Sequence, residues 1–351
     1  MVPTDSRTES ETQPALLDFL QAFAPQLASS DLSETWTKRE GLFLSVLVRT
    51  TGERPEALKE ALLCLAAQKS RDFEVLLLAH NGGPAATSEI QQQADDFIEV
   101  SGVATTVLQV QGGSRGEPLG LGIAQARGRY VAMLDDDDFV TEDWVNVFFN
   151  LEKNAPGRVL RVATAARGMA PSQGVVTSGR TVSSQDRIYH TRAWSVVDHR
   201  RWNRTPSHSF ALPLYPFRSL GVEVDTNLPV VEDWDLLVRV AVLCGVAESP
   251  AVTAVYNQHI EDTSLVRVAR AEWEEAEDSV RAKLSGPLLI DQDELDTYQD
   301  LFDRVVELES ALMSSEEQRE DLLRVIDQMR NSRGWKIIER YRSLKLGGRS
   351  N

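Results

Sequence analysis

The sequence of 351 residues has only two cysteines, few histidines and no long apolar run. Cys64 and Cys244 lie within apolar helical patterns, so we expect buried thiols in a reducing compartment. No apolar run reaches the roughly 18 residues that a membrane-spanning helix needs. The N-terminal stretch MVPTDSRTES lacks the basic and apolar regions of a secretory signal. Together these absences predict a cytoplasmic protein.

Positive charge is scarce except at the C-terminal end. The net charge is −16 at pH 7, which argues against non-specific binding of nucleic acid. Residues 330–351 nevertheless carry seven Lys and Arg residues against one acid, a charge of +6. The segment SRGWKIIERYRSLK mixes these cations with aromatic and aliphatic side chains, a pattern that suits an anionic membrane surface. The alternative is that the cations dock on the acidic body of the same chain.

Apolar runs alternate with helical patterns in the first half of the chain. Four runs have the length and composition of buried strands: LFLSVLV (42–48), EVLLLA (74–79), TTVLQV (105–110) and YVAML (130–134). Pro55 opens one intervening helix, and Gly128 ends another. This alternation predicts a mainly parallel sheet covered by helices on both faces, with ligands bound beyond the carboxyl ends of its strands.

The second half is less regular and ends in acidic helices. We expect a helix over 231–245 and a strand over 251–256, whereas 151–230 shows no clear period. After residue 266 the pattern is helical, and a seam recurs in alternating steps of three and four, the coiled-coil period: Tyr298, Leu301, Val305, Leu308, Leu312, Ser315, Arg319, Leu322, Ile326 and Met329. Two interpretations stay open, namely self-association through the seam and a helix folded back on the domain.

Four consecutive aspartates, Asp135 to Asp138, follow the last of the apolar runs. Adjacent carboxylates repel each other, so a cation normally accompanies them, and a hard divalent ion with oxygen ligands is the natural partner. If the backbone stays extended, Asp135 and Asp137 project to the same side and can grip one ion. The alternative is a solvated acidic loop that caps the following helix.

A second acidic cluster, Glu232-Asp233-Trp234-Asp235, opens the helix expected at 231–245. Acidic residues at a helix start complement the helix dipole without any further role. The functional interpretation is a general base beside an aromatic surface against which a sugar ring can lie. The residues alone leave both interpretations open.

The region from about residue 42 to 260 resembles the family-2 inverting glycosyltransferases of the GT-A fold. The resemblance is carried, in this order, by LSVLVRTTGERPEALKEALLCLAAQKSRDFEVLLL, GIAQARGRYVAMLDDDDFVTEDWV and LPVVEDWDLLVRVA. It implies an α/β fold of the GT-A type, with a Rossmann-like, mainly parallel sheet and helices on both faces. A C-terminal helical or coiled-coil extension follows this fold.

The resemblance and the seam together predict how the chain is organised. The expected parts are these: an N-terminal helical extension (1–40), a glycosyltransferase domain (41–265) with a nucleotide-sugar-binding half (41–150) and an acceptor-binding half (151–265), C-terminal helices with the coiled-coil seam (266–332), and a basic tail (333–351).

In such enzymes a D-x-D pair binds the metal and lies beside the donor. The resemblance assigns the metal, Mn²⁺ or Mg²⁺, to Asp137 with Asp135. It also places His259 where some GT-A enzymes supply a third ligand. Asp135, Asp136 and Thr50 are expected beside the nucleotide-diphosphate sugar.

The E-D pair of the family matches Glu232 and Asp233. The resemblance makes Asp233 the base that accepts the proton of the acceptor hydroxyl. Glu232 and Trp234 are expected at the acceptor, with the indole ring forming one wall of that site.

The chain departs from the family at two turns. Ala79-His80-Asn81-Gly82 stands where an Asp-Asp-Gly-Ser turn usually recognises the nucleotide base, so the base is not assigned. Arg49-Thr50-Thr51-Gly52 replaces the usual Pro-Thr-Tyr-Asn. The Gln-x-x-Arg-Trp signature of processive polysaccharide synthases is absent, which favours a single transfer.

The expected function is metal-dependent, inverting transfer of one sugar from a nucleotide-diphosphate sugar to an acceptor hydroxyl. A glycan, lipid-linked or other hydroxyl acceptor in bacterial cell-surface glycan or glycoconjugate synthesis fits this expectation. A homodimer through the seam and peripheral contact with the inner face of the membrane fit it too. Two alternatives stay open: a nucleotidyltransferase on a similar sheet, and a non-catalytic, degenerate glycosyltransferase that acts through its coiled coil.

Overall fold

The computed structural model describes most of the chain: residues 41–171, 180–182, 187–189, 193–259, 269–283 and 292–331. The N-terminal extension expected at 1–40 and the basic tail expected at 333–351 lie outside these residues. The chain divides into two units, Met1–Leu289 and Ile290–Asn351, and each is described by itself.

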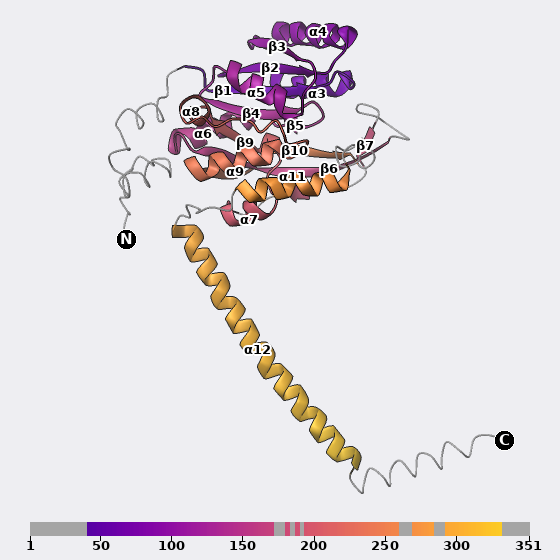
Figure 1. Cartoon of the computed structure of the whole chain (residues 1–351), viewed down its shortest axis with the longest axis vertical. Helices are drawn as coiled ribbons and strands as arrows, with labels where there is room; N and C mark the ends of the chain where they lie inside the picture. The colour runs from indigo at the N-terminus through magenta and orange to yellow at the C-terminus, as the bar shows by residue number, and fades with distance from the viewer. Residues whose placement is uncertain are drawn as a thin grey trace, which may run out of the picture. The chain divides into compact units, whose positions relative to one another are not determined.

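The first unit alternates strands and helices over its described residues (Figure 1). In chain order these elements are: β1 (Leu44–Thr50), α3 (Pro55–Ala66), β2 (Phe73–His80), α4 (Pro84–Ser101), β3 (Thr105–Val110), α5 (Gly116–Gln125), β4 (Tyr130–Asp135), β5 (Phe139–Val140), α6 (Trp144–Asn154), β6 (Val159–Pro171), β7 (Arg180–Val182), β8 (Arg187–Tyr189), α7 (Val196–Arg201), η1 (Ser207–Ser209), β9 (Phe210–Pro213), α8 (Tyr215–Ser219), α9 (Glu232–Cys244), β10 (Val246–His259) and α11 (Arg270–Lys283). The four strands predicted from apolar runs are all present, with ends that differ by at most two residues.

The described strands join one sheet in the order β3-β2-β1-β4-β9-β6-β10-β5, with β7 and β8 paired to β6. β3, β2, β1 and β4 are parallel neighbours. β9 runs antiparallel to both β4 and β6, and it joins this half to the parallel pair β6 and β10. The longer pairings are parallel, so the predicted α/β class with a mainly parallel sheet is confirmed.

Helices cover both faces of the sheet, as predicted. β1 is buried along nearly its whole length, and its successive residues point to opposite faces. Val46 and Val48 belong to the core formed with α3, α4 and α6, whereas Leu47 belongs to the core formed with α5 and α9. Burial on both faces explains why these strands are continuous apolar runs rather than alternating patterns.

Gly128 lets β4 lie against β1. A Cβ at this position would be 2.7 Å from the backbone nitrogen of Ser45, so no larger residue fits without a shift. The two strands pair in parallel, and their register places Arg49 beside Asp135. The acidic run after β4 therefore begins next to the end of β1.

The stretch 151–230 is more regular than expected, because it contains the 13-residue strand β6 and the short strand β9. Arg161 and Thr164 interrupt the apolar pattern of β6, yet both are buried. Arg161 pairs with Glu248, and Thr164 pairs with Ser209. The sequence did not indicate β6 and β9, because the local pattern does not reveal these partners.

The second unit contains α12 (Gln292–Asn331), a helix of 40 residues that carries the whole predicted seam. α11, expected among the C-terminal helices, lies in the first unit, where Ala276 and Val280 pack with Trp234 of α9. The domain boundaries expected at 265 and 332 stay predictions. None of the described helices is both long and apolar enough to span a bilayer.

Candidate active site

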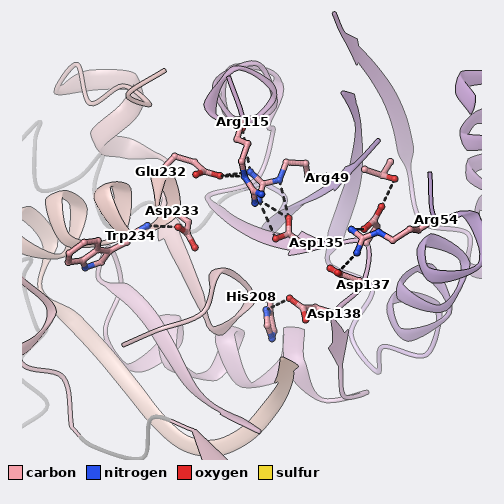
Figure 2. Close-up of polar contacts among 12 residues, drawn as sticks. Arg49, Arg54, Arg115, Asp135, Asp137, Asp138, His208, Glu232, Asp233 and Trp234 are labelled. Atoms are coloured by element: carbon pink, nitrogen blue, oxygen red, sulfur yellow. Dashed lines mark hydrogen bonds and ion pairs between the residues drawn. The ribbon is translucent and has the colours of Figure 1, made fainter. Parts of the chain in front are cut away.

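The acidic run after β4 turns instead of continuing the strand. Asp135 is the last residue of β4, and the backbone N–H of Asp138 donates a hydrogen bond to its carbonyl at 3.2 Å. The condition under which Asp135 and Asp137 would project to the same side, an extended backbone, is therefore not met. Asp135 and Asp137 contact different arginines, Arg49 and Arg54 (Figure 2).

Arg54, the residue before α3, pairs with two of the four aspartates. Its guanidinium contacts Asp137 and, at 2.5 Å, Asp136. The hydroxyl of Thr50 donates another hydrogen bond to Asp136 at 2.6 Å. Asp136 is buried, and this burial raises its pKa to about 6 although Arg54 opposes the shift. Thr50 and Asp136 are therefore buried against each other at the ends of β1 and β4 and do not face solvent.

Arg49 links the two acidic clusters. Its Nε and Nη2 atoms donate to the carboxylate of Asp135 at 3.0 and 3.2 Å, and its Nη1 atom pairs with Glu232 at the start of α9. Glu232 is buried and also lies 3.4 Å from Nε of Arg115. Burial alone would raise the pKa of Glu232, but the charges of Arg49 and Arg115 hold it below its ordinary value. One guanidinium therefore fastens the end of β4 to the start of α9.

Asp138, the last of the four aspartates, is buried, and its contacts support the fold. Its Oδ1 atom accepts a hydrogen bond from the backbone N–H of Asn257 at 2.9 Å, and its Oδ2 atom lies 3.2 Å from Nδ1 of His208. The side chain of Asn257 in turn donates to the carbonyl of Asp137 at 2.7 Å. Asp138 and Asn257 therefore hold the turn that carries Asp137 against β10.

Asp233 has the environment of a general base. It is half-buried in the first turn of α9, and Figure 2 shows its carboxylate on the side that faces Asp135. Burial and the charge of Glu232 raise the pKa of Asp233 to about 6. The backbone N–H of Trp234, which donates to Asp233 at 2.8 Å, opposes the shift. Such a carboxylate is ionised at neutral pH, yet it is more basic than an ordinary aspartate.

The backbone just before Asp233 is strained. Val231 has a φ of 59°, a left-handed conformation that β-branched residues rarely adopt. Strain of this kind persists only where the surroundings fix it, and here Val231 is buried with Val230 and Val238. The packing of α9 thus sets the direction in which Asp233 leaves the helix.

Trp234 and Glu232 do not face an acceptor. Trp234 is 0% exposed, its indole N–H donates to the carbonyl of His199 at 2.7 Å, and it packs in one cluster with residues of α11. The prediction that it forms a wall of the acceptor site is wrong, because the residue after Asp233 points about 100° away on a helix and here enters the core. Glu232 is also buried and is engaged by two arginines, so its expected role at the acceptor has no support.

Oxygen donors for a metal ion are present at the acidic turn. The side chains of Asp135 and Asp137 are 28% and 19% exposed, and carboxylate oxygens are ligands that Mn²⁺ and Mg²⁺ prefer. Their ion pairs with arginines indicate that this position favours a cation. His259 is the last residue of β10, but its side chain lies outside the described part of the chain. Over the described residues no three His, Cys, Asp or Glu side chains gather into a metal centre.

The turn after β2 is closed by its own side chains. Nε2 of His80 lies 3.0 Å from the carbonyl of Gly112, and Oδ1 of Asn81 accepts the backbone N–H of Gly112 at 2.6 Å. These contacts tie the end of β2 to the loop after β3. They lie where the resemblance led us to expect a base-recognising Asp-Asp-Gly-Ser turn.

Three arginines of the site were not predicted from the sequence: Arg49, Arg54 and Arg115. One signal pointed to them, since four adjacent carboxylates require nearby cations. Another was Arg49 itself, a charged residue near the end of a buried strand. Which cation meets which carboxylate depends on distant contacts, such as the pair of Arg49 with Glu232, 183 residues away.

Residues 45–201 match the model of one protein family, described as glycosyl transferase family 2. The resemblance expected from the sequence is therefore confirmed for this segment, which supports a glycosyl-transfer function. None of the curated proteins compared with the chain matches it.

Several solved structures share the fold at low sequence identity. S. aureus TarS is 14% identical over 72% of this chain, with a TM-score of 0.52, and this chain covers 41% of it. TarS 1–349 in complex with UDP-GlcNAc is 15% identical over 72% of this chain and 69% of its own, with a TM-score of 0.53. The mannosyltransferase PcManGT from Pyrobaculum calidifontis, in complex with GDP-Man and Mn²⁺, is 14% identical over 78% of this chain and 76% of its own, with a TM-score of 0.52. These likenesses confirm the predicted GT-A type of α/β fold.

Proposed function

We propose that this chain, whose residues 45–201 match glycosyl transferase family 2, is an inverting glycosyltransferase that moves one sugar from a nucleotide-diphosphate sugar to an acceptor hydroxyl. The observation that carries this proposal is the arrangement of the two acidic clusters. Asp233, with a pKa of about 6, faces the carboxylates at the end of β4. A one-step transfer needs two chemistries at one place, one for the acceptor proton and one for the charge of the leaving diphosphate.

Asp233 is proposed as the base. The acceptor oxygen forms a bond to the anomeric carbon while the bond from that carbon to the diphosphate oxygen breaks, and the hydroxyl proton passes to Asp233. Attack from the face opposite the leaving group inverts the configuration. The raised pKa of Asp233 supports this role, because a base with a pKa near neutrality takes a proton more readily than an ordinary aspartate.

Asp137 and Asp135 are proposed to hold Mn²⁺ or Mg²⁺, with His259 as a further ligand. When bound, a divalent ion neutralises the charge that develops on the leaving diphosphate. Both aspartates keep exposed oxygen atoms at the carboxyl ends of parallel strands, where ligands bind in α/β sheets. The similar fold of PcManGT, whose structure contains GDP-Man and Mn²⁺, adds support.

The donor is proposed to lie along the ends of β1 and β4, beside Asp135, Asp136 and Thr50. Because Thr50 and Asp136 are buried against each other, they shape this surface more than they project from it. Arg54 is 34% exposed, and a guanidinium matches a phosphate in both geometry and charge. The closed turn at His80 gives no indication of the nucleotide base, so UDP and GDP sugars both belong in the first test.

The acceptor and the setting are proposed from the sequence. A glycan, lipid-linked or other hydroxyl acceptor in bacterial cell-surface glycan or glycoconjugate synthesis suits this kind of transferase. The basic tail (333–351) would bring the enzyme to the inner face of the membrane through anionic lipids. The two halves 41–150 and 151–265 would serve the donor and the acceptor, with Asp137 in the first half and Asp233 in the second.

The function is tested by nucleoside diphosphate release from a panel of UDP, GDP and dTDP sugars with Mn²⁺. We expect the parent chain to turn over at least one donor, and Asp233→Asn to turn over the same donor far more slowly. Pyrophosphate release from a nucleoside triphosphate and a sugar phosphate would instead indicate a nucleotidyltransferase. If the chain neither binds nor turns over any of these donors, the result would favour the non-catalytic scaffold.

A further inference from the structure

Helix α12 exposes an apolar seam along its length. It has 40 residues and therefore extends about 60 Å at 1.5 Å per residue. The apolar side chains of the seam are 45% to 63% exposed in the single copy: Leu301, Val305, Leu308, Leu312, Leu322 and Ile326. Most of the stability of an amphipathic helix comes from packing its apolar face. We therefore expect this seam to pack against a partner surface.

We propose that α12 pairs with α12 of a second copy as a parallel, in-register, two-stranded coiled coil. The residue types support this choice, because β-branched residues at the first core position of the heptad and leucine at the second favour parallel dimers. The first core position of the seam holds two β-branched residues and one leucine (Val305, Ile326 and Leu312) beside Tyr298 and Arg319. The second holds three leucines (Leu301, Leu308 and Leu322) beside Ser315 and Met329.

Charge complementarity supports the parallel direction. Arg304 and Glu309 flank the seam on opposite edges, with the spacing at which residues of two parallel helices meet across the core. In the single helix Arg304 pairs with Glu307, an exposed pair that it can leave at little cost. An antiparallel coil would bring like edges together, and one of these edges carries both Glu309 and Glu316.

Arg319 fixes the register of the pair. It holds the first core position near the middle of the seam, and Ser315 holds the core position before it. A polar residue at one such position costs stability but selects two strands and one register. In register, the long side chains of two Arg319 residues reach solvent past the edges of the coil, whereas a shifted register would set each against apolar residues.

A parallel coil attaches both copies of the first unit to its same end, because that unit precedes α12 in each chain. Two transfer sites tethered in this way would bind a repetitive acceptor at raised effective concentration. This consequence rests on the proposed function, but the pairing itself does not. Failure of the activity assay and failure of the pairing are therefore distinguishable.

Sedimentation equilibrium of the full chain tests the pairing with two adjacent variants. Leu312 and Met313 are 60% and 72% exposed, and only Leu312 lies on the seam. We expect dimers for the parent and for Met313→Glu, and a dissociation constant raised at least about 100-fold for Leu312→Glu. A parent that is monomeric or larger than a dimer overturns the proposal. An equal change in the dissociation constant of the two variants also overturns it, because that result would indicate non-specific association or an interface elsewhere.

Oxidative cross-linking of Leu301→Cys tests the direction and the register. In the parallel, in-register coil the new thiols face each other, so we expect an intermolecular disulfide. In an antiparallel coil that aligns the apolar layers they would lie roughly 50 Å apart, at 1.5 Å per residue. The parent chain, with its own Cys64 and Cys244, provides the blank. A dimer in solution that fails to cross-link overturns the parallel register.

Discussion

Asp137 and Asp233 belong to two acidic clusters at the same edge of the sheet, and their surroundings differ in sign. Asp137 is paired with the guanidinium of Arg54, and its neighbour Asp135 is paired with Arg49. Asp233 lies beside the carboxylate of Glu232, whose charge adds to burial in raising the pKa of Asp233 to about 6. The first cluster is therefore arranged to hold positive charge, and the second is arranged to take up a proton.

The remaining carboxylates of both clusters support the fold. Asp138 is 3% exposed and accepts the backbone N–H of Asn257, while Asp235 is 0% exposed and pairs with Arg239 and Lys283. Each cluster thus combines carboxylates that hold the backbone in place with carboxylates that face the site. Residue type does not distinguish the carboxylates that hold the backbone from those that face the site. Burial and the sign of the neighbouring charge distinguish them.

The largest effect is expected from Asp233→Asn, which keeps the shape of the side chain and removes its basicity. We expect kcat to fall by about 10³-fold, because general base catalysis typically contributes 10²–10⁴-fold. Binding of UDP or GDP with Mn²⁺, measured by calorimetry, should stay at the level of the parent, since the base acts on the acceptor alone. Full turnover in this variant would remove the base assignment from Asp233 and make Glu232 the next residue to test.

A loss of about 100-fold is expected in Mn²⁺-dependent binding of UDP or GDP when Asp137 is changed to Ala, because this removes a proposed metal ligand. Circular dichroism should be unchanged, since Asp137 lies in a surface turn. Asp143→Ala is the matched control, because Asp143 pairs with the exposed side chain of Lys69 at 2.7 Å and lies outside the acidic turn. Equal binding by the parent and Asp137→Ala would contradict the D-x-D assignment.

A change of about tenfold is expected in kcat between the plateau and pH 5. The reaction needs ionised Asp233, whose pKa is about 6, so kcat should rise with pH through that value and level off above it. Stability should change in the opposite direction. Because the pKa of Asp233 is higher in the folded chain than in the unfolded chain, protonation of this group on going from pH 7 to pH 5 adds stability. A kcat that is flat over this range would show that Asp233 does not set the rate.

The sequence predicted the strands of the first half better than the site. β1 to β4 are apolar runs bounded by turn residues, and burial on both faces makes such runs easy to recognise. β6 was missed because Arg161 and Thr164 lie within it, and only the folded chain shows that both have buried partners. The general positions of Asp137 and Asp233 followed from the resemblance, at the end of a strand and the start of a helix.

The errors at the site concern contacts between distant elements. Whether the acidic run extends or turns depends on Arg49 and Arg54, which come from another strand and loop. Whether Trp234 faces solvent or the core depends on α11, which follows some forty residues later, and on the carbonyl of His199. Local periodicity gives the face of a helix only relative to its own apolar stripe. It does not say which later segment will cover the first turn.

The smallest effect, and the one that sharpens the comparison most, is expected from Arg54→Ala. If the first cluster holds positive charge, Arg54 and a metal ion compete for Asp137. Removing the guanidinium should then tighten binding of Mn²⁺ alone by about fivefold, in line with the roughly 1 kcal/mol of a partly exposed ion pair. Thr50 keeps its hydrogen bond to Asp136 in this variant, which helps to preserve the turn.

Electron paramagnetic resonance of free and bound Mn²⁺, without nucleotide, measures this effect directly. Arg71→Ala is the matched control, because it removes the same charge from a side chain that donates to backbone carbonyls at the end of α3. A general change in the charge of the chain would alter Mn²⁺ binding equally in both variants. Weaker Mn²⁺ binding in Arg54→Ala would mean that Arg54 positions the carboxylates for the ion rather than competing with it. The difference between the clusters would then lie in geometry and not in the charge that each one holds.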